Sequence, residues 1–305
     1  MKDPILIRYL VSNEQDLLWG ITVKNVGHQQ ISPGTLYPPH NHPSQYLFST
    51  NKGRVLNEFQ LLYITQGKGS FVSTNVKSTE INGGTIFLLF PGEWHSYQPD
   101  VSTGWDEYWI GFGGKDIEER VNNGFFSVQK PLFNVGIRDD IVQLYKQAIT
   151  TAIEQRSGFQ QVLAGIVSHL IGIAYARDKH SKFEDLRVVN QINQAKIRIL
   201  ENFTNDIDLK ALSKEMSMSY SWFRRIYKQY TGLSPYHYIQ ELRIQKSKEL
   251  LTDTMLTSQE VAYDVGFENP DYFCTAFKKH TGLSPIKYRE LVQGGKSKSS
   301  CLSAV

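Results

Sequence analysis

The pattern of apolar and polar positions divides this chain into two parts with different periods. Between about residues 20 and 113, short runs of apolar, β-branched and aromatic residues are separated by glycine and asparagine, as is typical of strands. From about residue 137 onwards, apolar residues recur every three or four positions, which predicts helices. We therefore expect a multidomain protein with a β domain followed by all-α segments.

Turn residues indicate where the predicted strands end. The runs 59–65 and 70–73 are separated by Gln66-Gly67-Lys68-Gly69, which predicts a hairpin. Asn82-Gly83 predicts a second turn, before the buried run 85–90. Short strands punctuated by glycine are typical of a small barrel or sandwich.

The helical part begins with two predicted helices that are separated at Ser157-Gly158. A polar stretch after them predicts a linker, and the final residues form a low-complexity tail that we expect to be disordered. The expected segments are a β domain, a helix pair, a linker, a helical domain and a tail, over residues 1–136, 137–177, 178–187, 188–293 and 294–305.

The last third of the chain contains an internal repeat. Residues 221–239 match residues 271–289 at an offset of 50, and both copies contain Thr-Gly-Leu-Ser-Pro. Upstream of these residues the repeat continues at an offset of 49. Each complete unit predicts a helix, a tight turn and a second helix, with Asp208 and Thr257 as N-caps of the first helices. The glycine of the shared pentapeptide is placed to end the second helix, and its proline to begin the next one.

Two such units are typical of helix-turn-helix proteins, whose second helix enters the major groove of DNA. The predicted inward stripes of the second helices are Phe223, Ile226, Tyr227 and Tyr230, and Phe273, Ala276, Phe277 and His280. The opposite faces carry Ser221, Arg224, Arg225 and Lys228, and Asp271, Cys274, Thr275 and Lys278. Arginine can read guanine, whereas the two lysines are placed to contact phosphates. The alternative is that these faces are simply the solvated surface of an all-α domain.

The charge distribution favours a polyanion partner for the C-terminal part. The net charge of the chain is +3, but residues 186–305 hold 17 basic and 12 acidic residues, which gives +5. Residues 1–185 hold the other 16 basic and 18 acidic residues, which gives −2. Together with the repeated unit, this asymmetry predicts that double-stranded DNA is the partner.

Composition favours a soluble protein of a reducing compartment. Two cysteines, Cys274 and Cys301, cannot form a disulfide framework. The N-terminus has no apolar segment typical of a secretion signal, and the longest apolar stretch, residues 164–176, is too short to span a bilayer. We therefore expect a cytoplasmic protein without a membrane partner.

The second repeat unit, from Val261 to Phe273 and from Gly282 to Arg289, resembles the DNA-binding domain of the AraC/XylS family of bacterial transcription regulators. The resemblance covers about 100 residues and implies that the second helix of each unit contacts bases. The positions that match are Ser221, Arg224, Arg225, Asp271, Cys274 and Thr275.

The β region is similar to a cupin barrel. Gly83-Gly84 and the later Pro91-Gly92-Glu93-Trp94-His95 resemble the second cupin motif, and His40-Asn41-His42 resembles the His-x-His of metal-binding cupins. Prolines around His40 and His42 indicate a loop rather than a strand, and no carboxylate follows at metal-motif spacing. We expect no metal, no cofactor and no catalytic residue, although a cupin metalloenzyme fused to a DNA-binding module is the alternative.

AraC-type regulators carry such a barrel as an effector-binding domain. The resemblance to the arabinose-responsive member implies that Arg54, Tyr97 and Trp109 line the pocket, with Glu107 where that member has histidine. Trp94 and His95 lie next to these positions in the sequence, and the set is suited to a sugar or oligosaccharide, because aromatic faces pack on sugar rings. The alternative for each aromatic residue is a place in the core or in a dimer contact.

By the same resemblance, the helices of 137–177 form a dimerisation element, and packing against the barrel alone is the equal alternative. The sequence thus predicts a ligand-responsive transcriptional activator that binds DNA as a homodimer and acts on RNA polymerase. A regulator without an effector, whose barrel only dimerises, is the remaining alternative.

Overall fold

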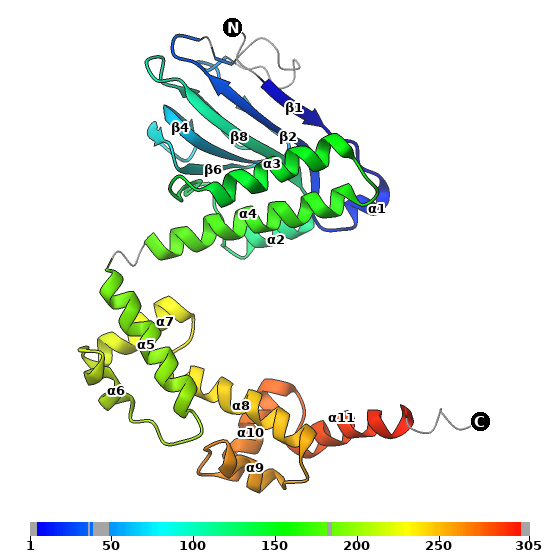
Figure 1. The fold of residues 1–305 in the computed structure, drawn as a ribbon, viewed down its shortest axis with the longest axis vertical. Coiled ribbons are helices and arrows are strands. Elements are labelled where there is room, and N and C mark those ends of the chain that lie inside the picture. Colours follow the sequence, from blue (N-terminus) through cyan, green and yellow to red (C-terminus); the bar gives the residue numbers. More distant parts are fainter. Residues whose placement is uncertain (1–4, 36, 39–48, 182–184, 300–305) are drawn as a thin grey trace. The chain divides into compact units, whose positions relative to one another are not determined.

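The computed structural model describes residues 5–35, 37–38, 49–181 and 185–299. They belong to two compact units, Met1–Glu184 and Asp185–Val305. The first is built on β-strands with helices on one side, and the second is helical (Figure 1). The predicted combination of a β domain with an all-α domain is therefore confirmed.

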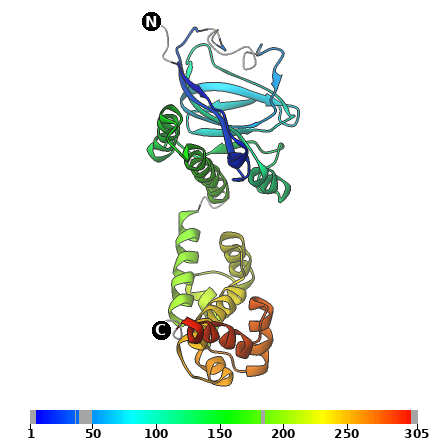
Figure 2. The ribbon, with the colours of Figure 1, turned by 90° about the vertical axis from the view of Figure 1, so that its right-hand side faces the viewer.

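The first unit contains one antiparallel sheet that curls on itself (Figure 2). Its strands are β1 (Ile5–Tyr9), β2 (Thr22–Ile31), β3 (Arg54–Val55), β4 (Phe59–Ser73), β5 (Thr79–Asn82), β6 (Thr85–Leu89), β7 (Trp94–Pro99), β8 (Trp105–Gly113) and β9 (Leu132–Asn134). The main order is β1-β2-β8-β4-β6-β9, and the second half of β4 pairs with β5 and β7. Within the described residues β1 and β9 do not pair, so the cupin-like sheet is rolled but not closed.

The hairpin predicted around Gly67 is wrong, because β4 runs without a turn from Phe59 to Ser73. A side chain at Gly67, whose φ is +85°, would begin 2.1 Å from the carbonyl oxygen of Gly104. A side chain at Gly69 would begin 2.3 Å from the carbonyl oxygen of Gln98. These glycines therefore allow close approach of neighbouring backbone at the bend of a long strand, and they do not end the strand.

Alternation along β4 separates two cores. Leu61 and Tyr63 face the helices, whereas Leu62 and Ile64 face the interior of the rolled sheet. The helices α3 (Asp139–Glu154) and α4 (Phe159–Ser181) cover the first face (Figure 1). Two short helices, α1 (Glu14–Leu17) and α2 (Lys115–Asn122), complete this unit.

Helix α4 is the helix among the described residues that is long and apolar enough to cross a membrane. Its residues Leu163, Val167 and Leu170 are fully buried in the core between the helices and the sheet. Because this packing accounts for its apolar side, α4 has the character of a core helix.

The second unit contains two small cores joined by one long helix. Its helices are α5 (Leu186–Asn202), α6 (Leu209–Glu215), α7 (Tyr220–Thr231), α8 (Pro235–Asp253), α9 (Ser258–Asp264), α10 (Pro270–Thr281) and α11 (Pro285–Ser299). The first core lies among α5, α6, α7 and the start of α8, and the second among the end of α8, α9, α10 and α11. The predicted caps are present, since Asp208 accepts from two backbone N–H groups and Thr257 forms a capping box with Glu260.

Three predictions for the helical segments need correction. Residues 178–181 belong to α4 and residues 186–187 to α5, so the predicted linker 178–187 is helical at both ends. The predicted tail is helical as far as Ser299. Gly294 and Gly295 each weaken a helix by about 1 kcal/mol, and this cost does not end α11. His280 is exposed and pairs with Glu241 of α8 at 2.9 Å, so it does not belong to the inward stripe.

Candidate effector pocket and DNA-binding surface

The interior face of β2, β8 and β4 forms the wall of a pocket. Three rows of directly opposed residues cross these strands: Gln29–Glu107–Ile64, Gly27–Trp109–Leu62 and Asn25–Gly111–Gln60. The pocket is lined by Tyr9, Asn25, Tyr37, Pro38, Arg54, Gln60, Leu62, Tyr97, Glu107 and Trp109. Aromatic rings therefore lie beside amide, carboxyl and guanidinium groups, as in many sites for polar small molecules.

The middle row places an aromatic ring on the pocket wall. A side chain at Gly27 would begin 2.2 Å from the indole of Trp109, so only glycine at this position leaves room for the ring. Trp109 is 7% exposed and lies opposite Leu62 of β4. An indole held in this way can pack against the apolar face of a sugar ring.

Arg54 is held at one end of the pocket by Tyr97 and His95. Its Nη2 donates to the Tyr97 hydroxyl at 2.6 Å, and its Nε donates to Nε2 of His95 at 3.3 Å. Burial and the neighbouring Arg54 charge lower the pKa of His95 to about 4, so the ring is neutral. With Nε2 as acceptor, Nδ1 carries the proton and donates to the Glu93 carbonyl at 3.0 Å. His95 therefore orients Arg54.

Glu107 is a buried carboxyl at the same end. The Tyr37 hydroxyl lies 3.4 Å from each of its oxygens. Burial raises the pKa of Glu107 to about 8, and this effect exceeds the lowering by Tyr37 and by the Arg54 charge. The carboxyl is therefore largely protonated at neutral pH in the absence of a ligand, and it can both donate and accept a hydrogen bond.

Four of the six predicted effector residues, Arg54, Tyr97, Glu107 and Trp109, meet in this pocket. The fifth, His95, contacts Arg54 without lining it.

Trp94 lies outside the pocket, which corrects its assignment. Its indole donates to the Lys52 carbonyl at 2.9 Å and packs against Gly53. Because side chains alternate along β7, Trp94 lies on the opposite face from His95 and Tyr97.

Sequence reasoning missed Asn25 and Gln60 of the pocket wall, and also Tyr37. A signal for Gln60 was present, because it is the polar residue in the apolar run 59–64. Its position shares one face of the strand with Leu62 and Ile64, so a period of two places it inside the sheet. For Asn25 no such signal was present, because Asn25, Gly27 and Gln29 on the same face of β2 do not form an apolar run.

No group of three or more histidine, cysteine, aspartate or glutamate side chains that could hold a metal ion is present in the described part of the chain. His40 and His42 lie outside the described residues. The Nε2 atom of His95, the third residue of the candidate cluster, accepts from the cationic Arg54, and this arrangement is unsuited to a metal ligand.

Helix α7 presents a basic face to solvent. Ser221, Arg224, Arg225 and Lys228 are all exposed, whereas Phe223 and Tyr227 on the other side are fully buried. The Arg224 guanidinium lies 5.7 Å from the centre of the Tyr220 ring, which limits its freedom. Arg225 is exposed, and among the described residues no ring contact of this kind holds its guanidinium.

Helix α10 presents the corresponding face of the second helix-turn-helix unit. Asp271, Thr275 and Lys278 are exposed, but Cys274 is half-buried and packs against the second core. The Thr275 hydroxyl donates to the Asp271 carbonyl at 3.0 Å. Cys274 thus has a structural contact in addition to its predicted place on the DNA-facing side, and burial raises its pKa.

The two helix-turn-helix units are fixed to each other by Arg243 of α8. Its Nε donates to the Phe203 carbonyl at 2.7 Å and its Nη2 to the Asn205 carbonyl at 2.8 Å, and both carbonyls belong to the first helix-turn-helix unit. The guanidinium also lies 5.8 Å from the ring centre of Phe267 in the second helix-turn-helix unit. Helix α8, which joins the two helix-turn-helix units, is about 28 Å long at 1.5 Å for each of its 19 residues, and one helical turn of DNA is about 34 Å.

Comparison with known proteins agrees with this division of the chain. Residues 24–186, more than half of the chain, match the model of the AraC-like ligand binding domain. Residues 212–291 match the model of a helix-turn-helix domain.

Individual relatives are similar over most of their length. The raffinose operon transcriptional regulatory protein of Pediococcus pentosaceus is 28% identical over 235 residues, which cover 75% of this chain and 83% of that protein. The lactose operon transcription activator of Staphylococcus xylosus is 27% identical over 229 residues, which cover 73% and 80%. Among solved structures, the C-terminal domain of a two-component response regulator from Fusobacterium nucleatum is 33% identical, with a TM-score of 0.32, and the match covers 33% of this chain and 99% of that one.

Proposed function

Because the chain belongs to the AraC family and is a ligand-responsive, DNA-binding transcriptional regulator, we propose that its effector is an oligosaccharide. The observation that carries this proposal is the meeting of Arg54, Glu107 and Trp109 in one buried pocket. A charged fork and a carboxyl group bind hydroxyls, and the indole packs against the C–H face of a pyranose.

The names of the relatives narrow the class of sugar. The raffinose and lactose operons of two relatives concern saccharides that both end in a non-reducing galactose unit. We therefore propose a galactoside of two or more units as the effector of this chain. Glu107, where the arabinose-responsive member has histidine, supports an effector other than arabinose.

On DNA, we assign base reading to exposed residues of α7 and α10, namely Ser221, Arg224, Arg225, Asp271 and Thr275, with Cys274 at the edge of this surface. Lys228 and Lys278 end the same faces and contact phosphates. Because Arg243 contacts both helix-turn-helix units, we expect α7 and α10 to bind one DNA site together.

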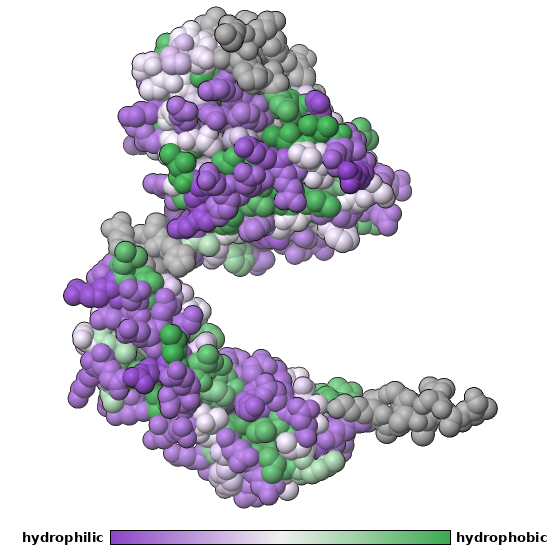
Figure 3. All heavy atoms as spheres, in the orientation of Figure 1, coloured by the Kyte–Doolittle hydropathy of each residue, from purple (hydrophilic) through white to green (hydrophobic). Residues whose placement is uncertain are grey.

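We further propose that the protein acts in the cytoplasm as a homodimeric activator, and that RNA polymerase is its target on DNA. Helices α3 and α4 carry the dimer contact, with the exposed apolar residues Ile153 and Val162 at their adjacent ends. Figure 3 shows hydrophobic residues scattered among hydrophilic ones on this side of the first unit, a pattern suited to a reversible contact.

Thermal unfolding of the full chain with a panel of sugars tests the effector class. We expect saturable stabilisation by raffinose or lactose and none by arabinose, because a ligand that binds the folded state raises Tm by mass action. Arg54→Gln removes the hydroxyl-binding fork and abolishes the shift. Stabilisation by none of the sugars, with an intact unfolding transition, would contradict the proposal.

A further inference from the structure

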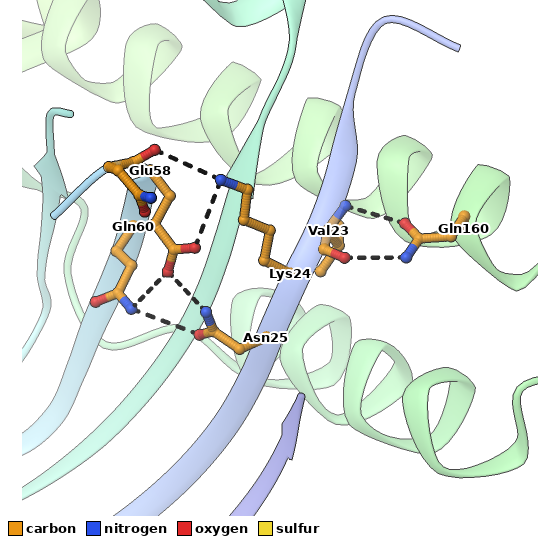
Figure 4. Close-up of polar contacts among 7 residues, drawn as sticks. Val23, Lys24, Asn25, Glu58, Gln60 and Gln160 are labelled. Atoms are coloured by element: carbon orange, nitrogen blue, oxygen red, sulfur yellow. Dashed lines mark hydrogen bonds and ion pairs between the residues drawn. The ribbon is translucent and has the colours of Figure 1, made fainter. Parts of the chain in front are cut away.

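A second polar cluster lies at the other end of the pocket. The Glu58 carboxylate accepts from Nδ2 of Asn25 at 2.7 Å and from Nε2 of Gln60 at 3.2 Å (Figure 4). Nε2 of Gln60 also approaches Oδ1 of Asn25 at 3.5 Å. All three side chains are at most 3% exposed, and Lys24 lies 4.0 Å from the carboxylate at the surface.

This polar cluster stabilises the folded state less than apolar residues at the same positions would. A buried carboxylate and two amides require desolvation, and apolar residues of similar volume would satisfy the packing. The strand opposite must also be glycine here, because a side chain at Gly111 would begin 2.3 Å from Nδ2 of Asn25 and 2.6 Å from Oε1 of Glu58. Stability alone therefore does not account for the arrangement.

The bonds of the cluster leave one acceptor directed elsewhere. Nε2 of Gln60 makes both of the amide's bonds, and Figure 4 shows the carbonyl oxygen of Gln60 pointing away from Glu58. Within the described part of the chain, no hydrogen bond to that oxygen is formed. Because Gln60 lines the pocket, Glu58 fixes an amide whose acceptor is available to a ligand.

The two polar ends are separated along one strand. Glu107 and Gly111 are four residues apart on β8, or about 13 Å at 3.3 Å per residue, and Trp109 lies midway between them. A single pyranose ring is shorter than this span. A ligand that reaches both ends and packs on Trp109 must therefore contain more than one sugar unit.

We propose that Asn25 and Gln60, oriented by Glu58, form a second saccharide subsite, which selects effectors of two or more units. One unit binds between Arg54 and Glu107, and the next extends past Trp109 to Gln60. This inference rests on the proposed function, since it assumes that the pocket binds a saccharide.

Calorimetric titration of the full chain with galactose, lactose and raffinose tests the inference. We expect lactose or raffinose to bind the wild type at least about tenfold more tightly than galactose. Gln60→Leu should weaken that oligosaccharide about tenfold and leave galactose binding unchanged, because about one hydrogen bond is lost. Glu58→Gln, which keeps the volume but removes the orienting charge, should give the same pattern and serves if Gln60→Leu does not fold.

Gln160→Leu is the matched control. Gln160 is also a buried glutamine, but its amide bonds the backbone of Val23 and does not line the pocket (Figure 4). This control should retain the wild-type preference for the oligosaccharide. Equal losses for galactose and the oligosaccharide in Gln60→Leu, no loss in that variant, or a wild type without preference would each overturn the inference. A wild type that binds none of the three sugars would instead overturn the proposed effector class, and the inference with it.

Discussion

The buried carboxyl of Glu107 makes the stability of the ligand-free protein depend on pH. Its pKa in the folded state is about 8, compared with an ordinary value of 4.5, because burial disfavours the charged form. Between these values the unfolded chain releases a proton that the folded chain retains. The free energy of unfolding therefore falls as the pH rises through this range.

The contribution of Glu107 to the free energy of unfolding can be separated from the contribution of His95. The full shift of Glu107 corresponds to about 5 kcal/mol at 1.36 kcal/mol per pKa unit. His95 has a folded pKa of about 4, below its ordinary 6.5, so its contribution is present above pH 6.5 and is lost as the pH falls towards 4. Between pH 6.5 and 8 the change at Glu107 exceeds that at His95, which is already half neutral in the unfolded chain at pH 6.5, and we expect a loss of up to about 2 kcal/mol.

Urea unfolding followed by tryptophan fluorescence at several values between pH 6.5 and 8 measures this loss. Glu107→Gln keeps the shape but cannot ionise, so its curve should lack the 2 kcal/mol decline. Glu80→Gln, at an exposed position of β5, is the control and should follow the wild type. If the wild type and Glu107→Gln lose stability in parallel, the carboxyl is ionised in the folded protein and the reasoning from burial is refuted.

Three further changes have defined outcomes. Arg225→Ala should weaken specific DNA binding by about 1–3 kcal/mol in fluorescence anisotropy, and an equal loss on random DNA would reassign it to phosphate. Arg243→Met removes the two hydrogen bonds that join α8 to the first helix-turn-helix unit and the contact with the Phe267 ring of the second, and it should weaken specific binding without unfolding either core. Unchanged affinity would show that the units need no such bridge. Gly27→Ala places a methyl group 2.2 Å from the Trp109 indole and should abolish stabilisation by sugar in thermal unfolding, and a retained shift would exclude that ring position from binding.

The sequence predicts local structure well where one residue type has one conformational role. Gly232 and Gly282 end their helices in the left-handed conformation, with φ of +86° and +79°, as the repeat predicts. Glycine at position 67 was misleading, because close packing against Gly104 and a turn favour the same residue. Only the neighbouring strand shows whether such a glycine allows close packing or forms a turn.

The sequence predicted some of the pocket residues and missed others, because only some of them belong to recognisable motifs. Arg54 and Tyr97 follow from motif positions, and the structure brings them together through the pairing of β3 with β7. Asn25 and Gln60 lie 35 positions apart, and their contact depends on the register of β2 and β4 against β8. That register is set by the whole sheet, so no local pattern reveals it.

The most direct test of the account is the affinity of the full chain for DNA with and without saturating raffinose or lactose. The DNA is a fragment selected in vitro for binding by this protein, and affinity is measured by fluorescence anisotropy at fixed salt. We expect a saturable change in DNA affinity with one of these sugars, which Arg54→Gln abolishes while sugar-free DNA binding persists. An affinity that neither sugar changes, for a protein that binds the fragment specifically, would contradict the claim that this pocket senses a saccharide for the DNA-binding domain.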